Sequence, residues 1–164
     1  MLALGIDPGT ATTGYGLVRL EPDGSLLAVK HGVITTPKNT PAPERLVILY
    51  DQLQELLREH KPETAAVEKL FFQRNITTAI AVGQARGVML LSLAQVGLEV
   101  FEYTPNEIKQ AVAGYGSAGK RQMQEMVRVL LELDTIPKPD DAADALAVAI
   151  CHLHSARMLD IANE

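Results

Sequence analysis

Hydrophobic positions in the first third of the chain predict three strands followed by a helix. Residues 2–7 form an almost unbroken apolar run, typical of a buried strand, and further strands are expected at 14–20 and 26–34. The segment 22–24, Pro-Asp-Gly, is a strong turn signal, so these three strands are expected to form an antiparallel meander. Leucines at helical spacing then predict a helix over 44–60.

The rest of the chain alternates strands with helices before it ends in helices. Thr104, Pro105 and Glu107 form a capping box with proline at the first helical position, which predicts a helix start. Further elements are expected as strands at 64–69 and 98–103 and as helices at 75–96, 120–133 and 140–158. This order implies an α/β fold, a mixed five-stranded sheet flanked by helices.

Length and composition favour a single soluble domain. A chain of 164 residues with 47% hydrophobic residues can fill one core, so residues 1–164 are expected to form one domain. Polar residues interrupt the apolar stretches before the roughly 20 positions that a membrane span needs, and no basic segment precedes an apolar one at the N-terminus. We therefore expect a cytoplasmic protein with no membrane partner.

For one cysteine and two histidines near the end of the chain, we expect structural roles. Cys151 lies among small apolar residues and is expected to be a buried core thiol. His152 and His154 fall near the predicted end of the last helix, where they are expected to favour the helix dipole or to face solvent.

Four acidic residues that lie far apart in sequence give the first indication of chemistry. Asp7 and Glu68 each end a buried apolar run, and Asp141 and Asp144 share a late helix face at i, i+3 spacing. Carboxylates brought together in a low-dielectric setting repel one another unless a cation neutralises them. Because Mg²⁺ prefers oxygen ligands and commonly bridges proteins to phosphate groups, this set suggests metal-dependent phosphoryl chemistry.

Spacing alone does not choose the third acid of this set. Asp140 is a rival for Asp141, because an i, i+4 pair with Asp144 would also place two carboxylates on one helix face. Helix capping is a further role for these acids, since the dipole at a helix N-terminus favours negative charge. These possibilities stay open at this point.

The distribution of charge along the chain bears on nucleic-acid binding. The net charge of −5 argues against a partner whose binding depends on neutralising phosphates. Residues 69–128, however, carry seven Lys or Arg against four Glu, a local balance of +3. Bound metal ions would also offset the charge of the four proposed ligands, so the acidic total is compatible with DNA binding at this face.

The segment from Gly114 to Arg121 nearly matches the phosphate-binding loop G-x-x-x-x-G-K-[ST]. Arg121 replaces the hydroxyl residue that should bind Mg²⁺, and residues 107–112 are predicted as helix where that loop needs a strand, which disfavours a nucleotide hydrolase. Exposed glycine N–H groups followed by Lys120 and Arg121 instead suit a DNA phosphate at a helix N-terminus. An ordinary solvated loop is the alternative.

Two adjacent aromatic residues follow the strand that ends at Glu68. Adjacent side chains at a strand end point to opposite sides, so Phe71 and Phe72 cannot both face the core. An exposed ring beside Arg74 could stack on or wedge between bases while the cation holds the backbone. The alternative is that one ring fills the core and the other closes over a helix.

With these residues in view, the chain resembles the RuvC family of bacterial Holliday junction resolvases over nearly its whole length. Actin-like kinases begin with a motif similar to the first one below, but their chains are far longer. The resemblance rests on motifs spread along the sequence: Gly5-Ile6-Asp7-Pro8-Gly9-Thr10, Val67-Glu68 with Phe71 and Asn75, Gly83-Gln84-Ala85-Arg86-Gly87, Glu102-Tyr103, Lys109-Gln110, Gly116-Ser117-Ala118 with Lys120, Met126-Val127-Arg128, and Asp140-Asp141-Ala142-Ala143-Asp144-Ala145-Leu146.

The resemblance implies an RNase H-like fold and a structure-selective endonuclease that works as a homodimer. Such an enzyme makes paired symmetric nicks in four-way DNA junctions, leaving 5′-phosphate and 3′-hydroxyl ends, in homologous recombination and DNA repair. It implies two Mg²⁺ ions per subunit, for which Mn²⁺ substitutes, and the branch-migration motor RuvA–RuvB as a partner.

The resemblance also implies residue roles. The family's DNA-contacting lysines match Lys109 and Lys120, the latter near the scissile phosphate. The aromatic residue that enters the junction matches Phe71, and Phe72 could share or take over its role. The alignment favours Asp141 over Asp140. The catalytic and metal-binding acids are then Asp7, Glu68, Asp141 and Asp144.

Two further classes are alternatives to a resolvase. A catalytically silent junction-binding module would use the acids only for structure, and it would bind branched DNA without cutting it. Another RNase H-like nuclease would cut RNA–DNA hybrids or flaps instead.

Overall fold

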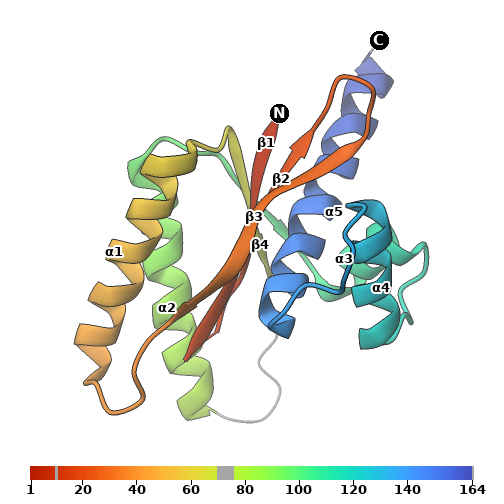
Figure 1. Cartoon of the computed structure of the whole chain (residues 1–164). Helices are drawn as coiled ribbons and strands as arrows, with labels where there is room; N and C mark the ends of the chain where they lie inside the picture. Colours follow the sequence, from red (N-terminus) through yellow and green to blue (C-terminus); the bar gives the residue numbers. More distant parts are fainter. Residues whose placement is uncertain (10, 70–75, 164) are drawn as a thin grey trace.

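The computed structural model describes residues 1–9, 11–69 and 76–163, which build a mixed five-stranded sheet with helices on both faces (Figure 1). The strand order is β3-β2-β1-β4-β5. The first three strands pair antiparallel, whereas β4 pairs parallel with β1 and β5 pairs parallel with β4. The bounds are Leu2–Asp7 for β1, Thr12–Leu20 for β2, Leu26–Thr35 for β3, Thr64–Glu68 for β4 and Val100–Tyr103 for β5. The predicted meander and mixed sheet are confirmed.

Two helices cover one face of the sheet and three cover the other, as Figure 1 shows. On one face lie α1 (Ala42–His60) and α2 (Ile76–Gln95), and on the other lie α3 (Pro105–Ala113), α4 (Lys120–Leu130) and α5 (Asp140–Asn163). The capping box at Thr104 is confirmed, with its hydroxyl accepting from the Glu107 backbone N–H.

Several element boundaries differ from the sequence prediction by two to five residues, including the starts of β2 and α1, which come two residues earlier. The last strand begins at Val100 instead of Leu98, because Gly97 adopts a φ of 75° and the Leu98 N–H still bonds to the Leu93 carbonyl behind α2. The fourth helix ends at Leu130, since Glu132 adopts a left-handed φ of 51° that the apolar pattern does not signal. The last helix continues beyond residue 158 to Asn163.

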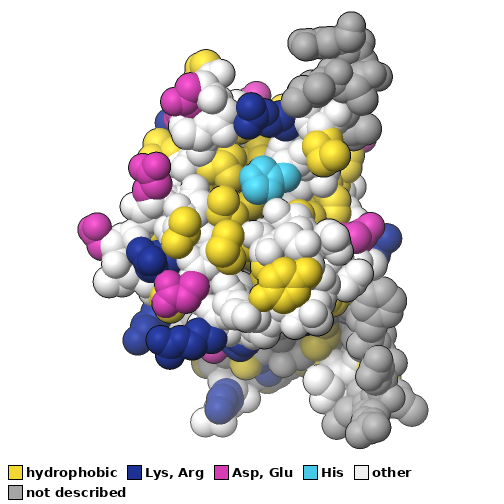
Figure 2. Space-filling model, turned by 90° about the vertical axis from the view of Figure 1, so that its right-hand side faces the viewer, with side chains coloured by type: hydrophobic (Ala, Val, Ile, Leu, Met, Phe, Trp, Pro, Cys, Tyr) yellow, Lys and Arg dark blue, Asp and Glu magenta, His cyan; other side chains and the backbone are white. Residues whose placement is uncertain are grey.

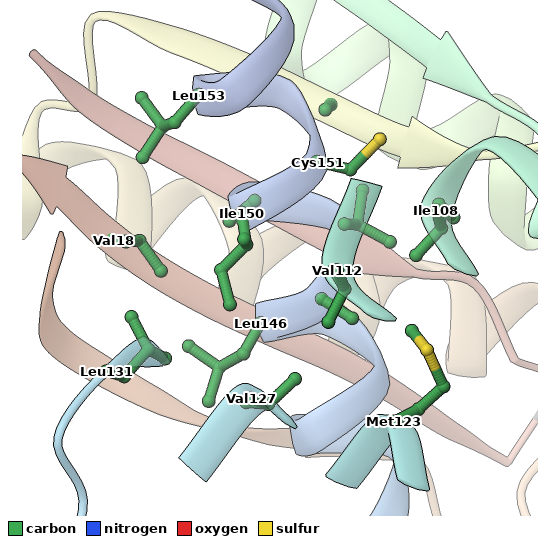
Figure 3. Close-up of a cluster of buried hydrophobic side chains, with 14 of the residues drawn as sticks. Val18, Ile108, Val112, Met123, Val127, Leu131, Leu146, Ile150, Cys151 and Leu153 are labelled. Atoms are coloured by element: carbon green, nitrogen blue, oxygen red, sulfur yellow. The ribbon is translucent and has the colours of Figure 1, made fainter. Parts of the chain in front are cut away.

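Alternating side chains along the strands divide the apolar residues into two cores. Leu4 and Ile6 of β1 pack with α1 and α2, whereas Ala3 packs with α3, α4 and α5. Figure 3 shows the second core, in which Leu146 and Ile150 of α5 meet Val127 of α4. Cys151 is buried in this core, as predicted.

Glycines let α5 lie directly against the central strands. A Cβ atom on Gly5 of β1 would lie 2.6 Å from the backbone nitrogen of Ala149, and one on Gly14 of β2 would overlap the backbone carbonyl of Asp141. Because no side chain separates the helix from these strands, the start of α5 lies beside the end of β1 and the start of β2.

The second helix combines an apolar sequence with low burial. Residues Thr77–Gln95 have a mean hydropathy of 1.2, so by length and composition alone this helix could cross a membrane, contrary to the expectation that no apolar stretch would be long enough. Its scattered polar residues are too few to lower the mean hydropathy below that of a candidate membrane span. Only 22% of the stretch is buried, and Ile80 and Leu91 are more than half exposed. Within the described residues, an apolar face of this helix is therefore left exposed.

Candidate active site

Strand geometry brings Asp7 and Glu68 to one edge of the sheet. Gly5 of β1 and Ala66 of β4 face α5, and Asp7 and Glu68 lie two residues further along the same strands, hence on the same face. Because β1 and β4 are neighbouring parallel strands, their carboxyl ends meet at one edge of the sheet. Each of the two carboxyl groups changes the pKa of the other.

The first turns of α5 bring Asp141 and Asp144 to the same edge. The close approach of Asp141 to Gly14 fixes the start of α5 against β2. Both acids are partly buried, and their negative charges raise the pKa of Asp7. The structure thus brings the four predicted acids into electrostatic contact from three elements.

Burial and mutual repulsion dominate the titration of this cluster. Burial, followed by the charges of Glu68 and Asp144, raises the pKa of Asp7 to about 8. Burial also raises the pKa of Glu68 and of Asp144, while Lys109 and Lys120 act in the opposite direction on these two groups. The cluster therefore carries more negative charge than its surroundings stabilise.

The donor set of the cluster suits a hard divalent cation. As the side chains stand, no three Asp, Glu, His or Cys residues within 1–9, 11–69 and 76–163 are grouped closely enough to hold a metal ion. The available donors are nevertheless all carboxylate oxygens, the ligand type that Mg²⁺ prefers. Their raised pKa values identify an environment in which a cation would relieve repulsion, so the residues present fit the expected metal.

The rival acid Asp140 faces a different helix. It is exposed, and its carboxylate lies 2.9 Å from Lys120 Nζ and accepts a hydrogen bond from Gln124 of α4. This contact with Lys120 holds the pKa of Asp140 below its usual value. Asp141, in contrast, acts on the pKa of Asp7. The pairing of Asp140 with α4 and its absence from the groups that act on Asp7 favour Asp141 over Asp140 as the third acid of the cluster.

Two predicted lysines border the acidic cluster. Lys109 of α3 and Lys120 of α4 line a cavity of about 200 Å³ together with Glu68 and Asp144. Arg121, next to Lys120, is exposed at the start of α4. Figure 2 shows Lys and Arg side chains gathered toward the lower end of this face, where α5 begins in Figure 1. Phe71, Phe72 and Arg74 lie outside the described residues.

Sequence reasoning missed the role of His152. Because α5 continues well beyond it, His152 is not at a helix end but is buried, with its ring nitrogens 2.9 Å from Thr64 Oγ1 and 3.0 Å from Tyr103 Oη. His154 is half-buried and lies 3.1 Å from the Ala111 carbonyl. The signal that could have found His152 is the apolar run 147–153 that surrounds it, which is typical of a buried helix segment.

A mixed sheet of this strand order, with acidic residues at the carboxyl ends of its central parallel strands, defines the class of RNase H-like nucleases. Residues 3–152 match the family model described as crossover junction endodeoxyribonuclease RuvC. The chain belongs to the RuvC family, whose members are metal-dependent nucleases.

Curated relatives and solved structures agree with this family. The chain is 59% identical to the crossover junction endodeoxyribonuclease RuvC of Desulfitobacterium hafniense over 160 residues, covering 98% of this chain and 96% of the relative. It is 61% identical to the same enzyme of Chloroflexus aggregans over 160 residues, covering 97% of this chain and 96% of the relative.

Thermus thermophilus RuvC matches with a TM-score of 0.90, 39% identity and 96% coverage of both chains. The same protein in complex with Holliday junction substrate matches with a TM-score of 0.88, 36% identity and 96% coverage of both chains. The yeast mitochondrial Holliday junction resolvase Ydc2 shares the fold, with a TM-score of 0.71 at 14% identity over 96% of this chain and 80% of its own.

Proposed function

We propose that this protein is a structure-selective endonuclease that resolves four-way DNA junctions by paired symmetric nicks. The products carry 5′-phosphate and 3′-hydroxyl ends, and the reaction serves homologous recombination and DNA repair. The observation that carries the proposal is the cluster of charge-coupled carboxylates beside Lys109 and Lys120, in a chain of the RuvC family.

Four carboxylates form the metal site in this proposal: Asp7, Glu68, Asp141 and Asp144. They hold two Mg²⁺ ions per subunit, for which Mn²⁺ substitutes. Bound divalent cations supply an activated water and stabilise the leaving 3′-oxygen. Asp7, whose pKa of about 8 keeps it largely protonated at neutral pH in the metal-free protein, releases its proton when it becomes a ligand.

Basic and aromatic side chains position the DNA. Lys120 and Lys109, which border the carboxylate cavity, bind phosphates, and Lys120 adds charge stabilisation as negative charge develops in the transition state. Arg121 and Arg74 contact the backbone near the site. Phe71 enters the junction core, where Phe72 shares or takes over its role.

The subunit works as a single domain over residues 1–164 within a homodimer. The exposed apolar face of α2 supports this proposal, because Ile80 and Leu91 would be buried against the same helix of a second copy. A twofold interface supplies two identical sites, which accounts for paired cuts. In the cytoplasm, the dimer acts with the branch-migration motor RuvA–RuvB.

Strand cleavage of a labelled mobile four-way junction tests the proposed function. A linear duplex and an RNA–DNA hybrid serve as parallel substrates, each with and without Mg²⁺. We expect paired symmetric nicks only in the junction and only with metal. Cutting of the hybrid alone would reassign the substrate while keeping the site, and binding of the junction without any cutting would indicate a binding module.

A further inference from the structure

Asp140, the first residue of α5, is held by two residues of α4 that lie one turn apart. Lys120 Nζ lies 2.9 Å from Asp140 Oδ2, and Gln124 Nε2 donates to Oδ1 at 3.0 Å. The i, i+4 spacing of Lys120 and Gln124 places both donors on one helix face, so each carboxylate oxygen has its own partner. This two-point contact is more ordered than a single exposed ion pair, for which the free-energy gain is usually small.

The same lysine points toward the proposed DNA site. Lys120 lines the cavity that also contains Lys109, Glu68 and Asp144, yet its side chain remains 59% exposed. An ammonium group with a carboxylate at contact distance attracts a phosphate less strongly, and the carboxylate itself repels the phosphate. Asp140 therefore acts on a partly exposed cation of this cavity.

We propose that Asp140 is an internal competitor for Lys120, which an incoming DNA phosphate must displace. The inference rests on the proposed function only in taking Lys120 as a DNA contact. In the DNA-free protein Asp140 keeps the lysine oriented beside the carboxylate cavity and weakens its attraction for any passing phosphate. Lys120 then binds a phosphate tightly only when other contacts already hold the DNA.

The variant Asp140→Asn removes the charge but keeps the size of the side chain and an oxygen for Gln124. The probe is a fluorescently labelled four-way junction, whose dissociation constant is measured by anisotropy in EDTA, where no strand is cut, at several salt concentrations. We expect binding about two- to fivefold tighter than for the wild-type protein, from the loss of an ordered ion pair. A plot of the logarithm of the association constant against the logarithm of the salt concentration should steepen by up to about 0.9. This is the change expected for one further phosphate contact.

Two comparisons separate this competition from a general charge effect. The control Asp134→Asn makes the same charge change at an exposed residue that lines a different hollow, and it should leave the affinity close to wild type. In a Lys120→Met background, Asp140→Asn should give no further gain in affinity, because the cation for which it competes is absent. A gain that persists without Lys120, or that Asp134→Asn reproduces, would overturn the proposal.

Other outcomes bear on the proposal in different ways. If Asp140→Asn abolished Mg²⁺-dependent cleavage as Asp141→Asn is expected to do, Asp140 would be a metal ligand and the inference would be wrong. Tight wild-type binding that Asp140→Asn leaves unchanged would overturn this inference alone. A wild-type protein that binds no junction would overturn the proposed function as well.

Discussion

The carboxyl group of Asp7 is more easily protonated in the folded protein than in an unfolded chain. Burial and the neighbouring charges raise its pKa to about 8, whereas an unperturbed aspartate titrates near 4. Since the folded state binds the proton more tightly, this group favours folding at low pH, and its contribution is lost as the pH rises from about 4 through about 8. The metal-free site therefore destabilises the fold under mildly alkaline conditions.

The variant Asp7→Asn should stabilise the metal-free protein at pH 8 while it abolishes cleavage. We expect the free energy of unfolding in EDTA to rise by about 1–3 kcal/mol at pH 8, and by much less at pH 5, because the amide carries no charge to bury. Urea denaturation at the two pH values measures this difference. Asp51→Asn on the exposed side of α1 is the control, and an equal gain there would contradict the role assigned to burial.

At the scale of elements, His152 connects α5 to the strands that carry the site. Its ring contacts Thr64 at the start of β4 and Tyr103 at the end of β5, and it packs on Phe101 with ring centroids 4.6 Å apart. Burial lowers the pKa of His152, so the folded protein keeps the ring neutral. Stability from this network is present above the unperturbed pKa of about 6.5 and is lost as the pH falls below it.

Replacing His152 with leucine should destabilise the fold by about 2–4 kcal/mol, because the buried Thr64 hydroxyl and the half-buried Tyr103 hydroxyl each lose a hydrogen-bond partner. Tyr103→Phe, which removes one of the two contacts, should cost about 1 kcal/mol. Thermal unfolding measured from pH 5 to pH 8 checks both values. The wild-type protein should lose stability toward pH 5 more steeply than His152→Leu does, and parallel pH profiles would refute a buried neutral histidine.

The contact between β2 and α5 depends on the absence of a side chain at Gly14. A methyl group in Gly14→Ala would overlap the backbone carbonyl of Asp141, so the start of α5 has to move away from the sheet. We expect a loss of about 2–4 kcal/mol in stability, as for overpacked cores, and a higher Mg²⁺ concentration for half-maximal cleavage. Gly119→Ala, whose Cβ would meet its nearest atom at 3.6 Å, should cost less than about 1 kcal/mol, the effect of alanine at the N-cap of α4.

At the scale of the whole molecule, the proposed homodimer would link the exposed apolar face of α2 to the outcome of the reaction. A nuclease with one site per chain can place two coordinated cuts only if two chains are held in a fixed relation. The long helix opposite the α3, α4 and α5 layer offers large exposed apolar side chains for this purpose (Figure 1).

Leu91→Glu should convert the proposed dimer to a monomer, because it places a charge in the proposed apolar contact. Light scattering after size-exclusion chromatography measures the mass, and a junction assay distinguishes single nicks from paired cuts. Val47→Glu on α1 is the matched control, since Val47 is 58% exposed and Leu91 is 53% exposed. A Leu91→Glu protein that remains dimeric and makes paired cuts would place the interface elsewhere.

Local sequence patterns were sufficient for most elements. The apolar run at β1, the leucine spacing of α1 and the capping box of α3 are short-range signals, and their elements form within a few residues of the predicted bounds. The end of α4 was predicted too late because the left-handed Glu132 has no sequence signal comparable to glycine. Helix α5 extends beyond its predicted end at Met158, because no glycine or proline follows Met158 to stop the helix.

The sequence by itself determined the chemical character of the site, because acids that end buried runs are unusual whatever the fold. Only the tertiary structure decided how these acids are arranged. The effect of Asp141 on the pKa of Asp7, the pairing of Asp140 with Lys120 and the burial of His152 depend on the close approach of α5 to β1, β2 and β4. That approach is set by glycines, and by the alternation of side chains between the two faces of strands that lie far from α5 in sequence. No local pattern within the helix therefore predicts it.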